Sequence, residues 1–472
     1  MEKLTIQEIL EATNGVLISG DTNSIISSVS TDSRAISKDA LFVPIIGENF
    51  DGHDFIEKSF ENGAKASFIT RNHKKYEDIV KNNLKSPGSL IEVSDTLEAL
   101  QKLAAYYRNK LQVVIIGITG SVGKTTTKEL LCSVLSENMK VFKSPGNING
   151  QLGTPLNILS IDNSYQAAVL EMGVSKIGEM NKLYNITRPD IGIITNIGVS
   201  HLENFKNIET TCYEKSQIIQ KENSKLYVNG DIPVLSKLHK NNINITKFGI
   251  NGDYKYKCDE ILSQCDKTSF VLSTPEFKDN IVIPCLGIHN VYNSLAAICV
   301  ALDMNMHIDD IKSGLLKFKN INKRQEILEF TDVILIDDSY NSSPDSVKSS
   351  VSIIKNLNAT GTVILILGDM LELGKNSKDI HFETGRHIAT EKINILITVG
   401  ENSEYLSQGV KSVNQNISCF HCKNNSEIIE KLEDINLIQD INNIKNKNLI
   451  LIKGSRSMHL EEVSEYIKNK YK

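Results

Sequence analysis

The segment 113–126 constrains the fold more than any other part of the chain. It opens with Val113–Ile118, which is rich in β-branched residues, as in a strand buried on both faces of a sheet. A glycine-rich turn follows, and residues 130–135 then repeat leucine and valine at helical spacing. Further apolar runs at Ala167–Leu170 and Ile191–Thr195 are separated by helical segments. This alternation predicts a mainly parallel sheet with helical crossovers.

The turn 117–126 has the sequence Gly-Ile-Thr-Gly-Ser-Val-Gly-Lys-Thr-Thr, and its strand–loop–helix context favours a phosphate-binding loop. Glycines let backbone N–H groups face an anion, the helix N-terminus adds a positive dipole, lysine reaches terminal phosphates and threonine can bind Mg²⁺. Ile118 stands where the common GxxxxGK[ST] pattern has its first glycine, so the loop is a variant. Nucleotide contacts are predicted for Gly120, Ser121, Val122, Gly123, Lys124, Thr125 and Thr126. ATP binding alone does not select a reaction, because kinases, transporters and motor ATPases share this loop.

Three α/β domains are expected, over residues 1–94, 95–320 and 321–472. The first is predicted to be small, since its apolar runs are short and alternate with Gly, Asp and Asn turns. A helix over 95–110, with Ser94 as a possible N-cap, leads into the central, phosphate-loop domain.

The central domain is expected to end in an antiparallel extension over 248–284 and a helix over 290–302. The third, Rossmann-like series has predicted strands at Val333–Ile336, Thr362–Leu367, Ile393–Val399 and Asn448–Ile452. Polar or glycine residues follow each strand, as at a ligand-binding edge, although βα turns are polar in any protein.

Composition excludes several classes of protein. The 472 residues carry a net charge of −5, and lysine and arginine do not gather on a basic face, so a nucleic-acid partner is not expected. Eight scattered cysteines indicate a reducing compartment rather than a disulfide framework. The N-terminus lacks the apolar core of a signal peptide, and no run is long enough to span a bilayer. A cytoplasmic monomer is expected.

Three further residues could take part in metal or phosphate chemistry. Glu171 and His201 follow predicted strands of the central domain and can converge at one sheet edge. A carboxylate suits Mg²⁺, whereas His201 could equally be a hydrogen-bonded structural histidine. Lys215 lies on a predicted helix, and sequence physics alone favours a solvated surface lysine.

Taken in order, these motifs resemble those of the Mur ligases, and the resemblance spans nearly the whole chain. The central motifs are Thr119–Thr127, Glu171–Gly173, Thr195–His201, the Glu-Lys-Ser segment at Lys215, and Gly287–Ala297. Thr31–Arg34 and Asn49–Phe55 resemble the uridine-diphosphate-sugar domain of the family. Asp338–Ser346, Leu367–Gly374 and Lys453–Met458 are similar to the members that add D-alanyl-D-alanine to UDP-N-acetylmuramoyl-tripeptide in cell-wall synthesis.

The resemblance implies a reaction and a set of nucleotide and metal contacts. ATP would phosphorylate a substrate carboxylate, and an amine would then displace phosphate to form an amide. Lys124 would neutralise the transferring phosphoryl group, Thr125 and Glu171 would bind one Mg²⁺, and His201 a second ion. Lys215 matches the family lysine that carries a CO₂-derived carbamate. Further nucleotide contacts would come from Asn290, on the helix predicted over 290–302, and from Arg324, Asp338 and Asn341 of the third domain.

The resemblance also implies a substrate site. The sugar nucleotide would contact Ser33, Arg34, Asn49, Asp51, His53, Asn147 and Asn149, and the dipeptide would contact Ser455 and Arg456. His53, between two aspartates in a glycine-containing turn, is interpreted as shaping the loop rather than as a catalyst. Two positions depart from the family pattern: Gln217 replaces the usual glutamate after Lys215, and Gly150 stands where a second asparagine is more usual.

Other interpretations remain open. A ligase that adds the third residue to the same nucleotide usually carries Asp-Asn-Pro-Arg, which this sequence lacks, and folylpolyglutamate synthetases lack the Thr31–Arg34 motif. A P-loop ATPase acting on a macromolecule would need a nucleic-acid face or partner helix. An inactive scaffold would tolerate the loss of Lys124, Glu171 or His201. Cys419-Phe-His-Cys422 could suggest zinc, but a single CxxC is a weak signal.

Overall fold

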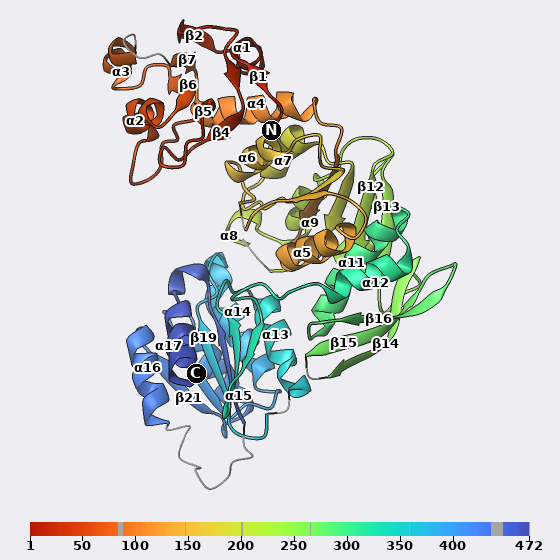
Figure 1. Ribbon diagram of the computed structural model, residues 1–472. Helices are drawn as coiled ribbons and strands as arrows, with labels where there is room; N and C mark the ends of the chain where they lie inside the picture. The colour runs from red at the N-terminus through yellow and green to blue at the C-terminus, as the bar shows by residue number, and fades with distance from the viewer. Residues whose placement is uncertain are drawn as a thin grey trace.

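The computed structural model describes residues 1–83, 88–146, 148–199, 202–264, 266–357, 359–435 and 447–471. Its elements form three α/β bodies that follow one another along the chain, with the central body between the other two (Figure 1). This is the three-domain α/β architecture that the sequence predicts. The domain boundaries after residues 94 and 320 stay predictions.

The N-terminal body is built on a five-stranded sheet of order β2-β7-β6-β5-β4. β2 runs antiparallel to β7 and the other neighbours pair in parallel, while β1 and β3 form a separate antiparallel pair. The strands are β1 (Leu4–Thr5), β2 (Val16–Ser19), β3 (Ile25–Ile26), β4 (Ser28–Ser30), β5 (Ala40–Phe42), β6 (Ala64–Thr70) and β7 (Ser89–Val93). The helices are α1 (Ile6–Thr13), α2 (Ile56–Glu61) and α3 (Tyr76–Asn83), with a 3-10 turn at Gly52–Phe55.

The central body contains a nine-stranded sheet of order β16-β15-β14-β13-β12-β11-β8-β10-β9. Its strands are β8 (Val114–Thr119), β9 (Val141–Lys143), β10 (Ala167–Glu171), β11 (Ile191–Ile194), β12 (Lys225–Asn229), β13 (Asn244–Gly249), β14 (Tyr256–Gln264), β15 (Lys267–Ser273) and β16 (Lys278–Ile283). All neighbours are parallel except β14-β15 and β15-β16. The predicted antiparallel extension is therefore present, but it begins after β13, which continues the parallel sheet.

Helices cover both faces of the central sheet. They are α4 (Thr96–Arg108), α5 (Lys124–Leu135), α6 (Gly153–Ser160), α7 (Glu179–Thr187), α8 (Leu202–Phe205), α9 (Ile208–Ser216), α10 (Pro233–Ser236), α11 (Ile288–Asp303) and α12 (Ile308–Leu316). The helix predicted over 95–110 forms as α4. Its N-cap is Asp95 rather than Ser94, because the Asp95 side chain accepts the Glu98 N–H. β8 occupies the middle of the sheet, where both faces are covered, and this explains its continuous apolar sequence.

One apolar core is shared by the first two bodies. Leu100 and Leu103 of α4 pack in the same buried cluster as Phe68 and Ile91 of the N-terminal sheet and Leu170 of the central sheet. Figure 1 shows α4 lying along the junction between these bodies. The Tyr107 hydroxyl, fully buried at the end of α4, donates to the carbonyl of Ile161 at 2.6 Å and accepts the N–H of Glu2 at 2.6 Å. Helix α4 therefore joins the two bodies by apolar packing and by hydrogen bonds.

The C-terminal body is a six-stranded sheet of order β17-β18-β22-β19-β20-β21, in which only β17 runs antiparallel to its neighbour. The strands are β17 (Glu326–Glu329), β18 (Val333–Asp338), β19 (Val363–Gly368), β20 (Ile395–Val399), β21 (Ser418–Cys422) and β22 (Asn448–Lys453). The helices are α13 (Pro344–Ser352), α14 (Ser377–Ile388), α15 (Glu404–Val413), α16 (Asn425–Asp434) and α17 (Glu461–Tyr471), with 3-10 turns at Ile354–Asn356, Gly374–Asn376 and Arg456–Met458. Two apolar clusters pack this sheet against helices on both of its faces.

The strands predicted for the C-terminal series all form, within two residues of the predicted ends. Asp337 and Asp338, expected just after a strand, are instead the last two residues of β18, because they pair with Ile452 and Lys453 of β22. Among the described residues, no helix has the length and apolar character needed to cross a membrane.

Replacing Tyr107 by Phe should lower the free energy of unfolding by about 1–3 kcal/mol, because the buried N–H of Glu2 and the carbonyl of Ile161 lose their partner. Urea denaturation followed by circular dichroism measures the change. Tyr213→Phe, at a residue that is 64% exposed, is the control and should unfold as the wild type does. Equal midpoints for both variants would contradict the role assigned to Tyr107.

Candidate active site

A cavity of about 1000 Å³ lies between the central and C-terminal bodies. The predicted residues that line it are Ser121, Val122, Gly123, Lys124, Thr125, Thr126, Asn149, Glu171, Asn290, Arg324, Asp338, Asn341, Ser455 and Arg456. Gly120 lies directly beside the cavity wall in the phosphate loop. Lys215 and the N-terminal candidates Ser33, Arg34, Asn49, Asp51 and His53 are not among the lining residues. Asn147 and His201 lie outside the described residues.

The phosphate loop depends on two glycines with positive φ. Gly120 has φ 153° and Gly123 has φ 85°, and Gly123 also caps the N-terminus of α5. A Cβ at Gly120 would lie 2.1 Å from the Thr195 hydroxyl, and a Cβ at Gly123 would lie 2.4 Å from the Asn293 side chain. The loop backbone therefore runs too close to its neighbours for any side chain at these positions.

The Lys124 side chain folds back over this loop, where its ammonium donates to the carbonyl of Gly120 at 2.9 Å. Burial lowers the pKa of Lys124; the carboxylate of Glu171 opposes this shift, while Arg324 of the C-terminal body adds to it. Lysine from the central body and arginine from the C-terminal body thus create a positive field in one cavity, which suits a polyphosphate.

Glu171 and Thr125 form the candidate magnesium site. The Thr125 hydroxyl donates to one oxygen of Glu171 at 2.8 Å, and the Asn149 amide donates to the other at 2.7 Å. Glu171 ends β10 and is buried, as is Thr125 in the first turn of α5. Hydroxyl and carboxylate oxygens are the ligands that Mg²⁺ prefers, so this donor set fits the ion. The buried side-chain oxygen of Asn196, a residue that lines the same cavity, has no hydrogen-bond partner among the described residues.

Lys215 is buried, so the interpretation as a solvated surface lysine is wrong. Its ammonium lies 5.9 Å from the centre of the Phe205 ring on α8. The pKa of Lys215 is lowered to about 7, chiefly by burial and also by the nearby charge of Lys124, while Glu214 opposes the shift. The Glu214 carboxylate is itself held by the N–H groups of Gly178 and Met180 at the start of α7, at 2.9 and 2.8 Å. A neutral amine is therefore accessible near neutral pH at this position.

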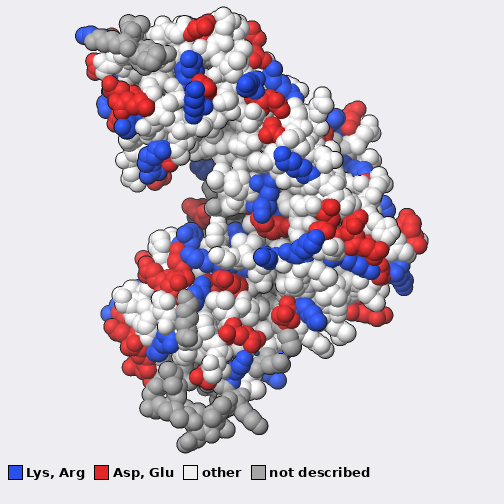
Figure 2. Space-filling model, viewed as in Figure 1, with Lys and Arg blue, Asp and Glu red and all other residues white. Residues whose placement is uncertain are grey.

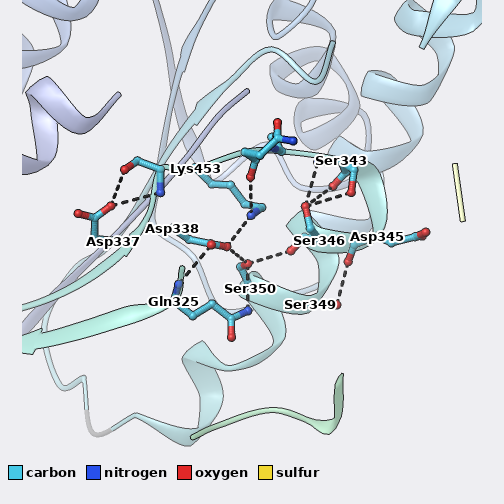
Figure 3. A network of polar contacts seen from close by, with 12 residues as sticks. Gln325, Asp337, Asp338, Ser343, Asp345, Ser346, Ser349, Ser350 and Lys453 are labelled. Atoms are coloured by element: carbon cyan, nitrogen blue, oxygen red, sulfur yellow. Dashed lines mark hydrogen bonds and ion pairs between the residues drawn. The ribbon is translucent and has the colours of Figure 1, made fainter. Parts of the chain in front are cut away.

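Asp338 is the centre of a polar network in the C-terminal body (Figure 3). Its carboxylate accepts hydrogen bonds from the Lys453 ammonium, the Ser350 hydroxyl and the Gln325 N–H. Lys453, which is buried, also donates to the carbonyl of Asn341 at 3.0 Å. The network holds the 338–343 loop against the cavity and leaves the Asn341 side chain exposed for a ligand.

Two arginines flank the Tyr340 ring at the cavity. The guanidinium of Arg324 lies 4.0 Å from the ring centre and that of Arg456 lies 5.8 Å from it. Arg456 is also paired with Glu461 at 3.0 Å, and its side chain is 56% exposed. Ser455 is buried and its hydroxyl accepts the N–H of Leu371 at 3.0 Å. Of these two predicted dipeptide contacts, Arg456 therefore has the more accessible side chain.

The N-terminal candidates form a separate group. His53 is buried; its Nε2 accepts the Thr70 N–H at 3.2 Å, so the proton lies on Nδ1, which donates to Asp51 at 2.9 Å. Asp51 also binds His73, whose ring stacks on His53 at 4.1 Å. The interpretation of His53 as a loop-shaping residue agrees with these contacts. The side-chain amide of Asn62 donates to the backbone carbonyl of Ser33 at 2.7 Å. Asn49 is exposed.

Arg34 is 88% exposed and pairs with Asp32 at 2.8 Å in the same loop. This hydrogen-bonded guanidinium lowers the pKa of Asp32 to about 2. The surface is hollowed between the N-terminal and C-terminal bodies on the side seen in Figure 2. The structure thus places the N-terminal group away from the cavity that contains the phosphate loop.

Several residues of the site were not predicted. Asn293 of α11 accepts from the Thr127 hydroxyl of α5 at 3.2 Å and donates to Asn290 at 3.2 Å, so it connects the helix that follows the phosphate loop with α11. Its spacing of three residues from Asn290 on one helix was an available signal. Lys128, fully buried, donates to the carbonyls of Ser144 and Gly146, and nothing in the sequence indicates this contact.

The zinc interpretation of Cys419 and Cys422 fails on geometry. Both lie on β21, but Cys419 packs with the apolar cluster on one face of the C-terminal sheet and Cys422 with the cluster on the other face. Residues three apart on a strand point in opposite directions, so the two thiols cannot bind one ion.

Comparison with known proteins assigns the family. Models of the Mur ligase family match at three places: the catalytic domain over residues 25–108, the Mur ligase middle domain over 118–301 and the glutamate ligase domain over 323–456. The Bacillus subtilis protein named UDP-N-acetylmuramoyl-tripeptide--D-alanyl-D-alanine ligase is 34% identical over 98% of both chains. The chain belongs to the Mur ligase family. The Haemophilus influenzae enzyme of the same name is 31% identical to this Mur ligase, over the whole of both chains.

Solved structures of Mur ligases agree with the fold. A crystal structure of MurF from Acinetobacter baumannii superposes with a TM-score of 0.87 at 28% identity and covers 99% of both chains. MurF from Thermotoga maritima, solved in complex with ADP, gives a TM-score of 0.79 at 26% identity and covers 94% of this chain and 97% of that one. The architecture of this Mur ligase is therefore that of its relatives along nearly the whole chain.

Replacing Lys215 by Met should raise the free energy of unfolding at pH 7, and this gain should shrink between pH 7 and pH 10.5. The folded state releases the Lys215 proton near its lowered pKa of about 7, whereas the unfolded chain keeps it up to the usual 10.5. Unfolding therefore takes up a proton in this window, so rising pH favours the folded wild type.

Urea denaturation from pH 6 to pH 10.5, in CO₂-free buffer with a chelator, measures this effect. Lys221→Met, at an exposed lysine of the same body, is the matched control and should show no such pH dependence. A gain for Lys215→Met that stays constant with pH would contradict the lowered pKa.

Proposed function

We propose that this Mur ligase joins D-alanyl-D-alanine to UDP-N-acetylmuramoyl-tripeptide and converts ATP to ADP and phosphate, giving UDP-N-acetylmuramoyl-pentapeptide for peptidoglycan synthesis. The observation that carries the proposal is one cavity in which Thr125 and Glu171 at the phosphate loop face Arg324 and Asp338 of the C-terminal body. The relatives from Bacillus subtilis and Haemophilus influenzae that match the full chain are named for this reaction.

The reaction proceeds in two displacements. An oxygen of the tripeptide carboxylate attacks the γ-phosphorus of ATP, ADP leaves, and an acyl phosphate forms. The free amine of D-alanyl-D-alanine then attacks the acyl carbon, and phosphate leaves as the amide forms and the nitrogen loses a proton. Lys124 balances the charge of the phosphoryl group during the first displacement, and Arg324 approaches the same phosphates from the other body.

Magnesium is expected to reduce the repulsion between the phosphates and the attacking carboxylate. Thr125 and Glu171 would bind one ion, because their oxygens meet beside the phosphate loop. A second ion is assigned to His201 by resemblance to the family. Lys215 would join it as a carbamate, since a neutral amine can add CO₂ with loss of a proton and so become a negatively charged oxygen ligand.

The substrates would enter from both ends of the cavity. The uridine diphosphate sugar is proposed to contact Ser33, Arg34, Asn49 and the loop shaped by Asp51 and His53. The peptide-bearing part of the substrate is proposed to contact Asn149 and Asn147, which belong to one segment. Arg456 and Ser455 are proposed to hold the carboxylate of the dipeptide. Because the N-terminal group does not line the cavity, a movement of the bodies has to complete the site. The cytoplasmic location and the monomeric state stay predictions.

The assignment is tested by incubating the purified chain with ATP, Mg²⁺ and D-alanyl-D-alanine and a panel of UDP-N-acetylmuramoyl-peptides. Phosphate release and mass spectrometry of the sugar nucleotide measure turnover and product. The pentapeptide product should form only with a tripeptide nucleotide and with the dipeptide present. Addition of a single amino acid to a shorter nucleotide would reassign the enzyme within its family.

Lys124→Ala should reduce ligation by at least about a thousandfold while the protein remains folded, because the lysine neutralises the transferring phosphoryl group. Phosphate release measures the first quantity and urea denaturation the second. Lys221→Ala, which removes an exposed lysine of the same body, should ligate normally. Turnover near the wild-type rate in Lys124→Ala would place the phosphates elsewhere.

Lys215→Ala should lose most of the ligase activity, and formate or acetate should restore part of it, because a small carboxylate can supply the oxygen ligands of the lost carbamate. The measurement is phosphate release against carboxylate concentration, with chloride at equal ionic strength as the control. Full activity without added carboxylate would remove Lys215 from the site. A complete absence of rescue would argue against a carbamate.

A further inference from the structure

The C-terminal body contacts the central body through a residue to which the reaction scheme gives no part. Asp345 lies in the first turn of α13 and does not line the cavity. In Figure 3 its carboxylate points away from the Asp338 network. The carboxylate lies instead against the loop that follows β11, beside Gly198. Burial there raises the pKa of Asp345, and the nearby N–H of Val199 opposes this rise. The side chain is thus half-buried between the two bodies.

The contact is unusually close at Gly198. A Cβ at this position would lie 1.8 Å from a carboxylate oxygen of Asp345, so the aspartate occupies the space that any side chain at residue 198 would need. The backbone conformation of Gly198 is not one that requires glycine. The close approach of Asp345 is therefore a sufficient reason for glycine here.

The same loop is joined to the phosphate loop by a reciprocal pair of hydrogen bonds. The Gly198 N–H donates to the Ser121 hydroxyl at 3.0 Å, and the same hydroxyl donates to the Gly198 carbonyl at 3.3 Å. The N–H of Ser121 also donates to the carbonyl of Asn196 at 2.9 Å. Asp345 is thus connected to Ser121, a predicted nucleotide-binding residue, through the single segment that contains Gly198.

A second contact lies on the far side of the same segment. The N–H of Glu203 donates to the carbonyl of Glu372 at 3.4 Å, and a Cβ at Gly374 would lie 3.3 Å from the Cα of Glu203. The C-terminal body therefore touches residues 198–199 and residue 203. Of these two contacts, only the one made by Asp345 reaches the loop that binds Ser121.

We propose that Asp345 is a positioning residue of the ligase, which couples docking of the C-terminal body to the shape of the phosphate loop through Gly198 and Ser121. This proposal rests on the proposed function and adds a specific residue to it. A carboxylate bound to a backbone N–H is a charge-assisted contact, stronger than one between neutral groups. When the C-terminal body docks, this contact fixes the loop behind Ser121; when it moves away, the loop loses that support.

The test compares Asp345→Asn with Glu404→Gln, which removes a carboxylate from the first turn of another helix of the same body at an exposed position. Asp345→Asn should lower kcat about tenfold, the factor expected for one charge-assisted hydrogen bond, with the KM for ATP changed less than about twofold. Glu404→Gln should behave as wild type. An unchanged kcat in Asp345→Asn would overturn the proposal.

A double-mutant cycle separates coupling from simple docking. In a Ser121→Ala background the connection to Gly198 is broken, so Asp345→Asn should then lower kcat by less than about threefold. The same tenfold loss in both backgrounds would overturn the proposal, since Asp345 would then act without Ser121. If Asp345→Asn proves unstable, Gly198→Ala provides the second variant, because its added methyl group displaces Asp345 and should reproduce the loss of kcat. Wild-type kcat in a folded Gly198→Ala would also overturn it.

Failure of the proposed function can be distinguished from failure of this inference. If the wild-type enzyme forms no amide product, the function is refuted, and Asp345 is tested by small-angle X-ray scattering with and without ADP. Any ADP-dependent decrease in the radius of gyration should be smaller in Asp345→Asn than in Glu404→Gln. Equal responses of the two variants, or no response in the wild type, would overturn the coupling.

Discussion

The site depends on a backbone that passes closer to its neighbours than a side chain allows. Gly120 lies under the Thr195 hydroxyl and Gly123 under Asn293, both with positive φ, so that the chain can turn from the central strand β8 into α5. Every other element of the site is arranged around that turn. Glu171 approaches from β10, and Asn290 and Asn293 approach from α11.

Several charged side chains are buried in the central and C-terminal bodies. Lys128, Lys215 and Lys453 are each nearly inaccessible to water, as are Glu171 and Glu214. Most of these groups are satisfied by named partners, such as the backbone carbonyls that receive Lys128 and the helix N-terminus that binds Glu214. Buried charges are tolerated where each has a well-placed hydrogen-bond or ionic partner. Removing one partner leaves the other charge buried and unpaired, which strongly destabilises the folded state.

Sequence periodicity predicted the fold well because it reports local burial. The apolar run that forms β8, and the strands of the C-terminal sheet, stand out within a few residues of sequence. The burial of Lys215 could not be predicted in this way, because α9 has polar residues around most of its circumference and is covered by other elements. Contacts such as Asp338 with Lys453, or His53 with His73, follow from strand register and loop packing across many residues. Only the tertiary structure determines them.

The core shared along α4 makes the first two bodies mechanically one. Leu100 and Leu103 are covered on one side by the N-terminal sheet and on the other by the central body. A fragment beginning after residue 94 would expose this apolar surface to water and would tend to aggregate. We therefore expect a large relative motion to be carried by the C-terminal body, and transplanting the first body between relatives would require α4 and its neighbours to be transplanted with it.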